Sequence, residues 1–321
     1  MHLSTPLLKL PIRFSVQALQ DEVRSLPPSA WVPHATGFAG NVAVRLATVG
    51  GGETDAFEGP IRPTEHLTSS PYIQQIMAEL AGVWGRSRLM GLDPEAEVPP
   101  HVDVHYYWRT HLRIHIPIIT SPAVTFTCGG GSAHMAAGEC WVFDSFRWHD
   151  VQNKGSERRV HLVLDTVPTE RLWDLVDTAR SGQANPFLLE PGARKPGPLL
   201  FENLNAPKVM SPWEIRWHVG YLADHSVKGP QLDHLLERLD RFADGWAALW
   251  AQFGTTDQGI TAYSNFLAAA REELREDAEA VILDNELSFF TALEQSVFVM
   301  AIHPSVQSQL QATIGQRREA Y

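Results

Sequence analysis

The chain has 321 residues, which is long for one ordinary core and indicates one large domain or two smaller ones. Hydrophobic residues make up 44% and charged residues 20%, a globular composition that excludes a disordered or fibrous protein. Because the formal net charge of -11 repels a phosphate backbone, we expect no nucleic-acid binding.

Nothing in the sequence has the pattern of a membrane-directed segment. Residues 1–14 lack the apolar core and cleavage site of a signal peptide. No run of about 18 uncharged apolar residues occurs; the nearest, 287–303, contains Glu294 and indicates a buried helix. We therefore expect a soluble, cytoplasmic protein that does not bind a membrane.

The two cysteines, Cys128 and Cys140, are too few for a disulfide framework. Their spacing also differs from that of the paired cysteines in a zinc ribbon. We interpret them as small buried residues on neighbouring strands, with no role assigned to either.

Helix and strand patterns alternate in the first part of the chain. Residues 15–26 have the period of an amphipathic helix, and residues 41–49 alternate as a strand that ends in a glycine-rich turn. Residues 70–84 predict a helix with Ser70 as N-cap and Pro71 at its first position.

From about residue 86 to residue 167 the period changes to two. Five short apolar stretches alternate with turn clusters such as TSP, GGGS and AAGE. Many short strands at this spacing predict a β-barrel or a double-sheet roll. Residues 169–180 then return to the period of a helix.

Residues 182–212 hold six prolines and predict a linker or a long wrapping loop. Beyond them the pattern is helical, and residues 230–253 carry an apolar stripe. We interpret the stripe as a core-facing helix, with a homodimer seam as the alternative. The sequence thus predicts a β-rich domain over 1–181, a linker over 182–212 and an all-helical domain over 213–321.

Seven of the fourteen histidines lie between His101 and His161. In the strand HLRIHIPII, His111, Arg113 and His115 share one face because side chains alternate along a strand. Such a face cannot meet a dry core without partners, so we expect it to line a wet or liganded cavity. In RRVHLVLD, Arg159 and His161 alternate with apolar residues in the same way.

A metal site is predicted from His101, Asp103 and His149. The first two lie two residues apart on an extended segment, so their side chains point the same way. His149 follows about 45 residues later, after another strand. Two histidines and one carboxylate leave open coordination positions and suit non-haem Fe(II). We interpret His105 and His134 as ordinary core or surface histidines, and His161 likewise.

The segment resembles the aspartyl/asparaginyl β-hydroxylase family, which includes bacterial proline hydroxylases. The similar stretches are PPHVD, LRIHIPI, HMAAGECWVFD, WHDVQN and RRVHLVLD, within about residues 84–167. The resemblance implies a double-stranded β-helix, of the jelly-roll or cupin-like type, with Fe(II) as cofactor and 2-oxoglutarate and O2 as cosubstrates. With flanking N-terminal helices and the C-terminal helical domain, the expected fold class is α+β.

The resemblance also assigns roles to single residues. It implies that His101, Asp103 and His149 hold iron and that Arg159 pairs with the distal carboxylate of 2-oxoglutarate. Its R-x-H pair, here Arg113 and His115, contacts the same cosubstrate. A planar guanidinium suits a carboxylate, which agrees with the role of Arg159.

Substrate contacts are expected near the mouth of the site. The loop after the first two ligands supplies Tyr107, Trp108 and Arg109, and Trp148 precedes the ligand His149. His111 occupies the position at which animal members of the family have an arginine near the substrate, which weakens the expectation of an acidic substrate side chain.

These observations predict an Fe(II)- and 2-oxoglutarate-dependent dioxygenase. Its reaction would be hydroxylation of an aliphatic carbon of an amino acid or a peptidyl residue, with release of succinate and CO2. A cupin-like metalloenzyme that does not use 2-oxoglutarate is one alternative. A non-catalytic binding module on the same barrel is the other.

Overall fold

The computed structural model describes residues 3–182, 185–193, 197–303 and 305. The backbone divides into two compact units. The first contains residues 1–103 and 110–205, and the second contains residues 104–109 and 206–321. The chain therefore enters the second unit directly after Asp103 and returns to the first unit at Thr110.

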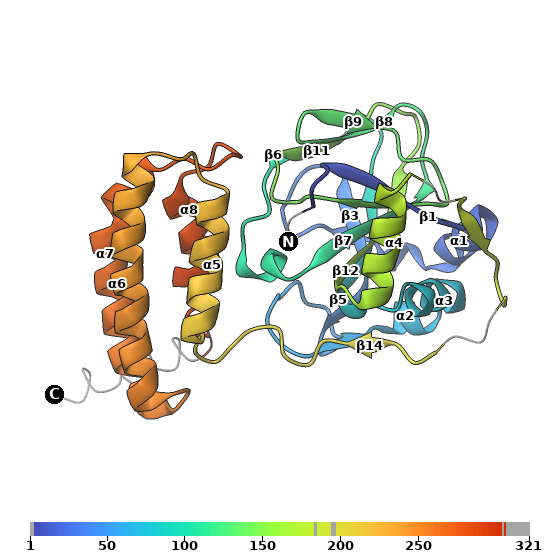
Figure 1. The fold of residues 1–321 in the computed structure, drawn as a ribbon. Helices are drawn as coiled ribbons and strands as arrows, with labels where there is room; N and C mark the ends of the chain where they lie inside the picture. Colours follow the sequence, from blue (N-terminus) through green and yellow to red (C-terminus); the bar gives the residue numbers. More distant parts are fainter. Residues whose placement is uncertain (1–2, 183–184, 194–196, 304, 306–321) are drawn as a thin grey trace. The chain divides into compact units, whose positions relative to one another are not determined.

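The first unit is built on a ten-stranded, mainly antiparallel sheet, part of which is labelled in Figure 1. Along its main path the strand order is β13-β1-β10-β7-β12-β5-β3-β2, while β14 pairs with β5 and β4 with β3. The strands are β1 (Leu7–Phe14), β2 (Val32–Pro33), β3 (Asn41–Val49), β4 (Ile61–Pro63), β5 (Val83–Leu92), β7 (Leu112–Ile119), β10 (Glu139–Phe143), β12 (Arg159–Val167), β13 (Phe187–Leu189) and β14 (Leu200–Phe201).

A second, four-stranded antiparallel sheet has the order β6-β11-β8-β9. Its strands are β6 (Glu97–His101), β8 (Val124–Cys128), β9 (Gly131–Ala133) and β11 (His149–Asn153). An apolar cluster joins the two sheets: Phe126 and Val151 from the small sheet pack with Leu92 and Phe143 from the large one. Asn153 also links them, since its side-chain amide donates to the carbonyls of Leu92, Asp93 and Glu157.

Helices cover the other face of the large sheet. They are α1 (Val16–Ser25), α2 (Glu65–Thr68), α3 (Pro71–Leu80) and α4 (Glu170–Arg180). Along β7, Leu112, Ile114, Ile116 and Ile118 belong to the core shared with these helices, so the predicted apolar face is confirmed. Burial of each such side chain contributes about 1.5–3 kcal/mol, which fixes which face of β7 turns toward the small sheet.

The predicted α+β class and double-sheet architecture are confirmed, although the described strands form two sheets and no closed barrel. Part of the proline-rich segment 182–212 is itself in the large sheet, where β13 runs parallel to β1 and β14 parallel to β5. Cys128 and Cys140 are both buried and unbonded to each other, but they lie in different sheets and not on neighbouring strands.

The second unit is helical in its described part. It contains α5 (Pro212–Asp224), α6 (Pro230–Phe253), α7 (Ile260–Ala280) and α8 (Phe289–Leu293). The apolar stripe of α6 turns inward: Leu235, Leu239 and Trp246 are buried, and the Trp246 indole donates to the carbonyl of Met210. Among the described residues, no helix is both long and apolar enough to cross a membrane.

Replacement of Asn153 tests the link between the sheets. Asn153 is 1% exposed, so Asn153→Ala leaves the backbone carbonyls of Leu92, Asp93 and Glu157 without this donor. Loss of one partner of a buried hydrogen bond costs about 1–3 kcal/mol. Urea unfolding should show a decrease of this size in the free energy of unfolding, whereas Gln152→Ala on the same strand should show a much smaller one. Equal effects would contradict the role of Asn153.

Candidate metal centre and its surroundings

Three side chains of the first unit come together as a metal-ligand cluster. His101 ends β6 and His149 begins β11, and the two residues are directly paired in the small sheet. Asp103 follows β6. One ligand atom from each of His101, Asp103 and His149 lies within 4.8 Å of the others. The structure therefore brings together the three residues that the sequence predicts as ligands.

Both imidazoles are oriented by backbone carbonyls. The Nδ1 atom of His101 lies 2.9 Å from the carbonyl oxygen of Pro99, and that of His149 lies 2.9 Å from the carbonyl oxygen of Arg147. This contact makes Nδ1 the protonated nitrogen and leaves Nε2 as an electron-pair donor. The two backbone carbonyls thus orient both rings with Nε2 available for a metal.

The Nε2 atom of His149 is buried and has no hydrogen-bond partner among the described residues. It lies 3.9 Å from Asp103 Oδ2, which is too far for a hydrogen bond. Burial lowers the pKa of His149 to about 4, against the opposing effect of Asp103, so its ring is neutral near pH 7. A buried, neutral and unsatisfied imidazole nitrogen beside a carboxylate fits a divalent metal ion.

Asp103 is held from two sides. Its backbone N–H donates to the carbonyl of Ser145 at 2.9 Å. Its Oδ2 accepts from Arg113 Nη1 at 3.3 Å, while Arg113 Nε donates to Asp165 Oδ1 at 3.0 Å. Arg113 therefore orients a predicted metal ligand, and its contact with a cosubstrate stays a prediction.

A second polar group lies on the face of the large sheet from which Arg113 projects. Arg159, at the start of β12, is 4% exposed, and its Nη2 lies 2.9 Å from Nδ1 of His161. Burial lowers the pKa of Arg159 to about 9, so the guanidinium is still charged near pH 7. Within the described residues no carboxylate forms an ion pair with it, and its Nε has no hydrogen-bond partner. The charge of Arg159 thus lacks an anion.

His115 lies between the metal cluster and Arg159. Its ring packs edge-on against Phe126, Phe143 and His161 at centroid distances of 5.2–5.7 Å. Burial, followed by the charge of Arg159, lowers the pKa of His115 well below its usual value. Its buried Nδ1 has no partner in the described part of the chain. A neutral imidazole here can hydrogen-bond a ligand.

The predicted substrate residues separate into two groups. Tyr107, Trp108 and Arg109 lie in a short 3₁₀ helix (Tyr106–Arg109), where the sequence predicts a connecting loop, and all three are buried. In the second unit, the guanidinium carbon of Arg109 lies 3.2 Å from the ring centroid of Tyr221. The described contacts of Arg109 are those of a core residue of that unit, and its role toward a substrate stays a prediction.

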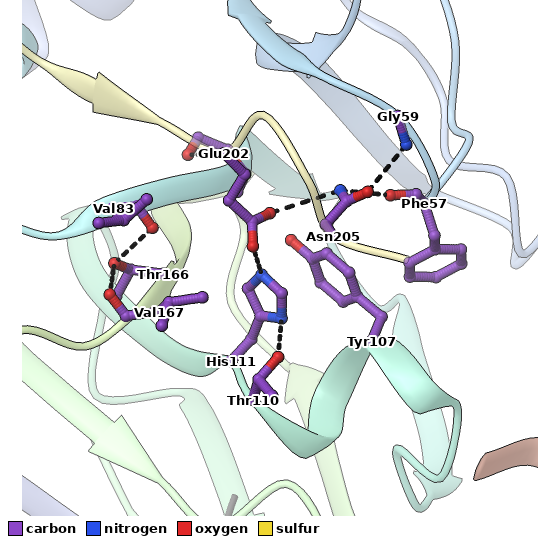
Figure 2. Close-up of polar contacts among 12 residues, drawn as sticks. Phe57, Gly59, Val83, Tyr107, Thr110, His111, Thr166, Val167, Glu202 and Asn205 are labelled. Atoms are coloured by element: carbon purple, nitrogen blue, oxygen red, sulfur yellow. Dashed lines mark hydrogen bonds and ion pairs between the residues drawn. The ribbon is translucent and has the colours of Figure 1, made fainter. Parts of the chain in front are cut away.

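His111 and Trp148 belong to the first unit. The Nε2 atom of His111 lies 2.8 Å from Glu202 Oε1, and both side chains are buried (Figure 2). Glu202 also faces Asn205, whose amide contacts Phe57 and Gly59. His111 therefore fastens the 202–205 segment to the sheet. Trp148 is 39% exposed beside the predicted ligand His149. The roles of His111 and Trp148 toward a substrate stay predictions.

Sequence reasoning missed two partners of the predicted residues. Asp165 holds Arg113, and Glu202 holds His111. The signal for Asp165 was available, because it shares the face of Arg159 and His161 at a two-residue period. Glu202 lies 91 residues from His111 in a proline-rich segment, where no periodicity marks the side of a residue.

Comparison with known proteins identifies the region around the cluster. Residues 57–168 match the Aspartyl/Asparaginyl beta-hydroxylase family model. The resemblance seen in the sequence is thereby confirmed, and the family is one of hydroxylases. The matched segment contains His101, Asp103, His149 and Arg159. No curated protein matches the chain.

Solved structures that are similar to part of this chain include an oxidoreductase of the 2OG-Fe(II) oxygenase family from Burkholderia pseudomallei. It is 12% identical, with a TM-score of 0.37 over 49% of this chain and 80% of that one. A prolyl-4-hydroxylase from Pseudomonas putida is 12% identical, with a TM-score of 0.35 over 52% and 94%. A cupin domain from Bordetella pertussis is 16% identical, with a TM-score of 0.21 over 25% and 79%.

Metal titration tests the cluster. We expect the apo-protein to bind Co²⁺ or Mn²⁺ at one site, with His149→Ala binding weakest and Asp103→Ala in between. Loss of an outer-shell partner alone costs about 10–100-fold in affinity, so loss of a ligand should cost roughly 100-fold or more. Calorimetry measures the affinities, and His234→Ala, at an exposed histidine of α6, is the control. Parent-like affinity in Asp103→Ala would remove Asp103 from the ligand set.

The helical unit provides a pH test. His218 is 1% exposed, and burial, followed by the charge of Arg109, lowers its pKa to about 3. In the unfolded chain a histidine titrates near 6.5, so between these values the unfolded state binds more protons. The free energy of unfolding should therefore fall as pH falls from about 6.5. His218→Phe should reduce this slope by up to about 1.4 kcal/mol per pH unit, measured by urea unfolding at several pH values.

Proposed function

We propose that the chain is an Fe(II)- and 2-oxoglutarate-dependent oxygenase that hydroxylates an aliphatic carbon of an amino acid or a peptidyl residue. The observation that carries the proposal is the pairing of two features in the first unit. One is the His101, Asp103 and His149 cluster, and the other is the buried cation of Arg159. The match of residues 57–168 to a hydroxylase family supports it.

The donor set supports iron in particular. Two imidazole nitrogens and one carboxylate leave coordination positions for a cosubstrate and O2, as in non-haem Fe(II) oxygenases. When bound, Fe(II) with 2-oxoglutarate and O2 supplies the oxidant for C–H hydroxylation, with succinate and CO2 as the other products. His101, Asp103 and His149 would hold the metal through Nε2 and carboxylate oxygens.

The remaining residues bind, orient and exclude water. Arg159 supplies a planar, charged donor for the distal carboxylate of 2-oxoglutarate, and the Nδ1 of His115 is a second polar contact. A cavity of about 90 Å³ beside Arg159 is also lined by Thr120 and Ser121. Phe126 and Phe143 pack beside His149 and shield that side of the cluster from water.

The cupin-like alternative without 2-oxoglutarate leaves Arg159 unexplained. A buried guanidinium is costly unless an anion pairs with it. A metalloenzyme that binds no dicarboxylate offers this charge no partner, and a binding module without catalysis has no need of the three convergent ligands. The oxygenase proposal accounts for both features.

Replacement of Arg159 tests the proposal. Arg159→Gln should bind metal like the parent but require more 2-oxoglutarate, because a charged donor to the carboxylate is lost. Removal of one partner of a buried charge pair costs about 2–5 kcal/mol, so the apparent KM for 2-oxoglutarate should rise by roughly 30-fold or more. Succinate formation across a panel of amino acids and short peptides is the measurement.

The neighbouring residue supplies a matched control. Arg158 is 41% exposed and pairs with Asp93 at 2.5 Å, so Arg158→Gln should leave the KM for 2-oxoglutarate unchanged. An unchanged KM in Arg159→Gln would withdraw the anchor, and an absence of 2-oxoglutarate turnover with every substrate would favour the cupin-like alternative.

A further inference from the structure

A group of arginines lies on the same face of the large sheet as the metal cluster. Arg45 on β3 is paired in register with Arg88 on β5, and Arg88 is paired with Val163 on β12. Paired residues of neighbouring strands project from the same face of a sheet. Val163 alternates with Leu162 and Leu164 of the helix-covered core, so these arginines project away from the helices.

The arginines gather around one aspartate. Arg45 Nη2 lies 2.5 Å from Asp55 Oδ2, and Arg88 Nη2 lies 3.0 Å from Asp55 Oδ1. Arg86, two residues before Arg88, donates to the backbone carbonyl of Asp55 at 3.0 Å, and its guanidinium carbon lies 3.5 Å from the ring centroid of Phe57. Two guanidinium groups thus share the carboxylate of Asp55, and a third contacts its backbone carbonyl.

Arg45 and Arg88 have donors to spare. Within the described residues, Asp55 is the one carboxylate at ion-pair distance from either of them, and the buried Nε atoms of both have no hydrogen-bond partner. Arg88 Nη1 lies 3.0 Å from Nε2 of His34. Burial, followed by the charge of Arg88, lowers the pKa of His34 to about 4, so this histidine is a neutral acceptor near pH 7. At ion-pair distance, Arg45 and Arg88 therefore share one carboxylate within the described residues.

The cluster is next to the metal ligands and separate from Arg159. Asp165 and Arg113 both act electrostatically on Arg88, and Arg113 contacts the ligand Asp103. Arg159, in contrast, is paired with Leu92, four residues further along β5 from Arg88. Four residues of a strand span roughly 13 Å. The face thus has two cationic positions, Arg159 at one end and the Arg45 and Arg88 pair near the middle.

We propose that Arg45 and Arg88 bind a dianionic end group of the substrate, either two carboxylates or a phosphate, and so determine the substrate class. Guanidinium groups match the oxygens of carboxylate and phosphate in pairs. Two such groups that share one aspartate keep donors for a second anion. The inference rests on the proposed function, since it names the substrate of the same site.

Binding of defined probes tests this proposal without turnover. Calorimetry of the full-length protein with Mn²⁺ and 2-oxoglutarate, without oxygen, compares L-aspartate, O-phospho-L-serine and L-proline. We expect one of the two dianion-bearing probes to bind at least about tenfold more tightly than L-proline, since hydrogen bonds to charged groups have this worth. Aspartate against phosphoserine distinguishes two carboxylates from a phosphate.

Variants locate the binding. Arg45→Gln and Arg88→Gln should each remove the preference for the dianionic probe. If Arg88→Gln does not fold, Arg88→Lys replaces it; this variant keeps the charge and should keep part of the preference. Arg158→Gln should bind like the parent, and Arg159→Gln should keep the preference while it loses 2-oxoglutarate.

Three results would overturn the inference. One is a parent protein that binds neither dianionic probe more tightly than L-proline. Another is a preference that survives Arg45→Gln and Arg88→Gln or is lost in Arg159→Gln alone. The third is a lowered melting temperature in Arg45→Gln with unchanged probe affinity, which would make the cluster structural. None of these results depends on succinate formation, which tests the oxygenase proposal.

Discussion

The structure of the first unit depends on the two-residue alternation of side chains along β7 and β12. Leu112, Ile114 and Ile116 turn toward the helices and are fully or almost fully buried, so a shift of one residue would expose them. The register that buries them also commits Arg113 and His115 to the opposite face, toward the small sheet. The apolar core thus determines the position of the polar site, because burying the apolar side chains of a strand also fixes the side to which its polar side chains project.

Because the register fixes which arginines project from the polar face, their charges must be compensated there. Each arginine on the polar face must find an anion or polar partners, because a buried guanidinium without them is costly. Arg113 has two carboxylates, Asp165 and Asp103, and Arg88 shares Asp55 with a second arginine. Arg159 has His161 and no carboxylate within the described residues. The degree of compensation therefore differs from one end of the face to the other, and anionic ligands are expected where it is least complete.

Much of the site could be predicted from the sequence because it lies on regular strands. A fixed period tells which residues share a face, and the H-x-D spacing places two ligands side by side. The predicted strand over residues 41–49 and the helices near 15–26 and 169–180 appear in the structure for the same reason. The pairing of His101 with His149 in the small sheet brings the third predicted ligand next to the two that the H-x-D spacing places together.

What could not be predicted comes from segments without a period. The 3₁₀ helix at residues 106–109 is a single turn, too short for a repeat, and its assignment to the helical unit depends on tertiary packing. Glu202 contacts His111 from a proline-rich segment, in which no periodic pattern predicts the side to which a side chain projects. Arg86 and Arg88 do lie at a two-residue spacing on a predicted strand, yet their meaning appears only when β3 brings Arg45 beside them.

At residues 103–110 the chain passes from the first unit to the second and returns. Asp103 is fixed within the first unit by its backbone bond to Ser145 and by Arg113. The next six residues fold with the helical unit, and Tyr106 donates to Glu214 of that unit at 2.5 Å. The contacts described for Asp103, with Ser145 and Arg113, thus both lie within the first unit. Because Asp103 is the last residue of the first unit before Val104, this predicted carboxylate ligand is anchored immediately before the chain enters the second unit.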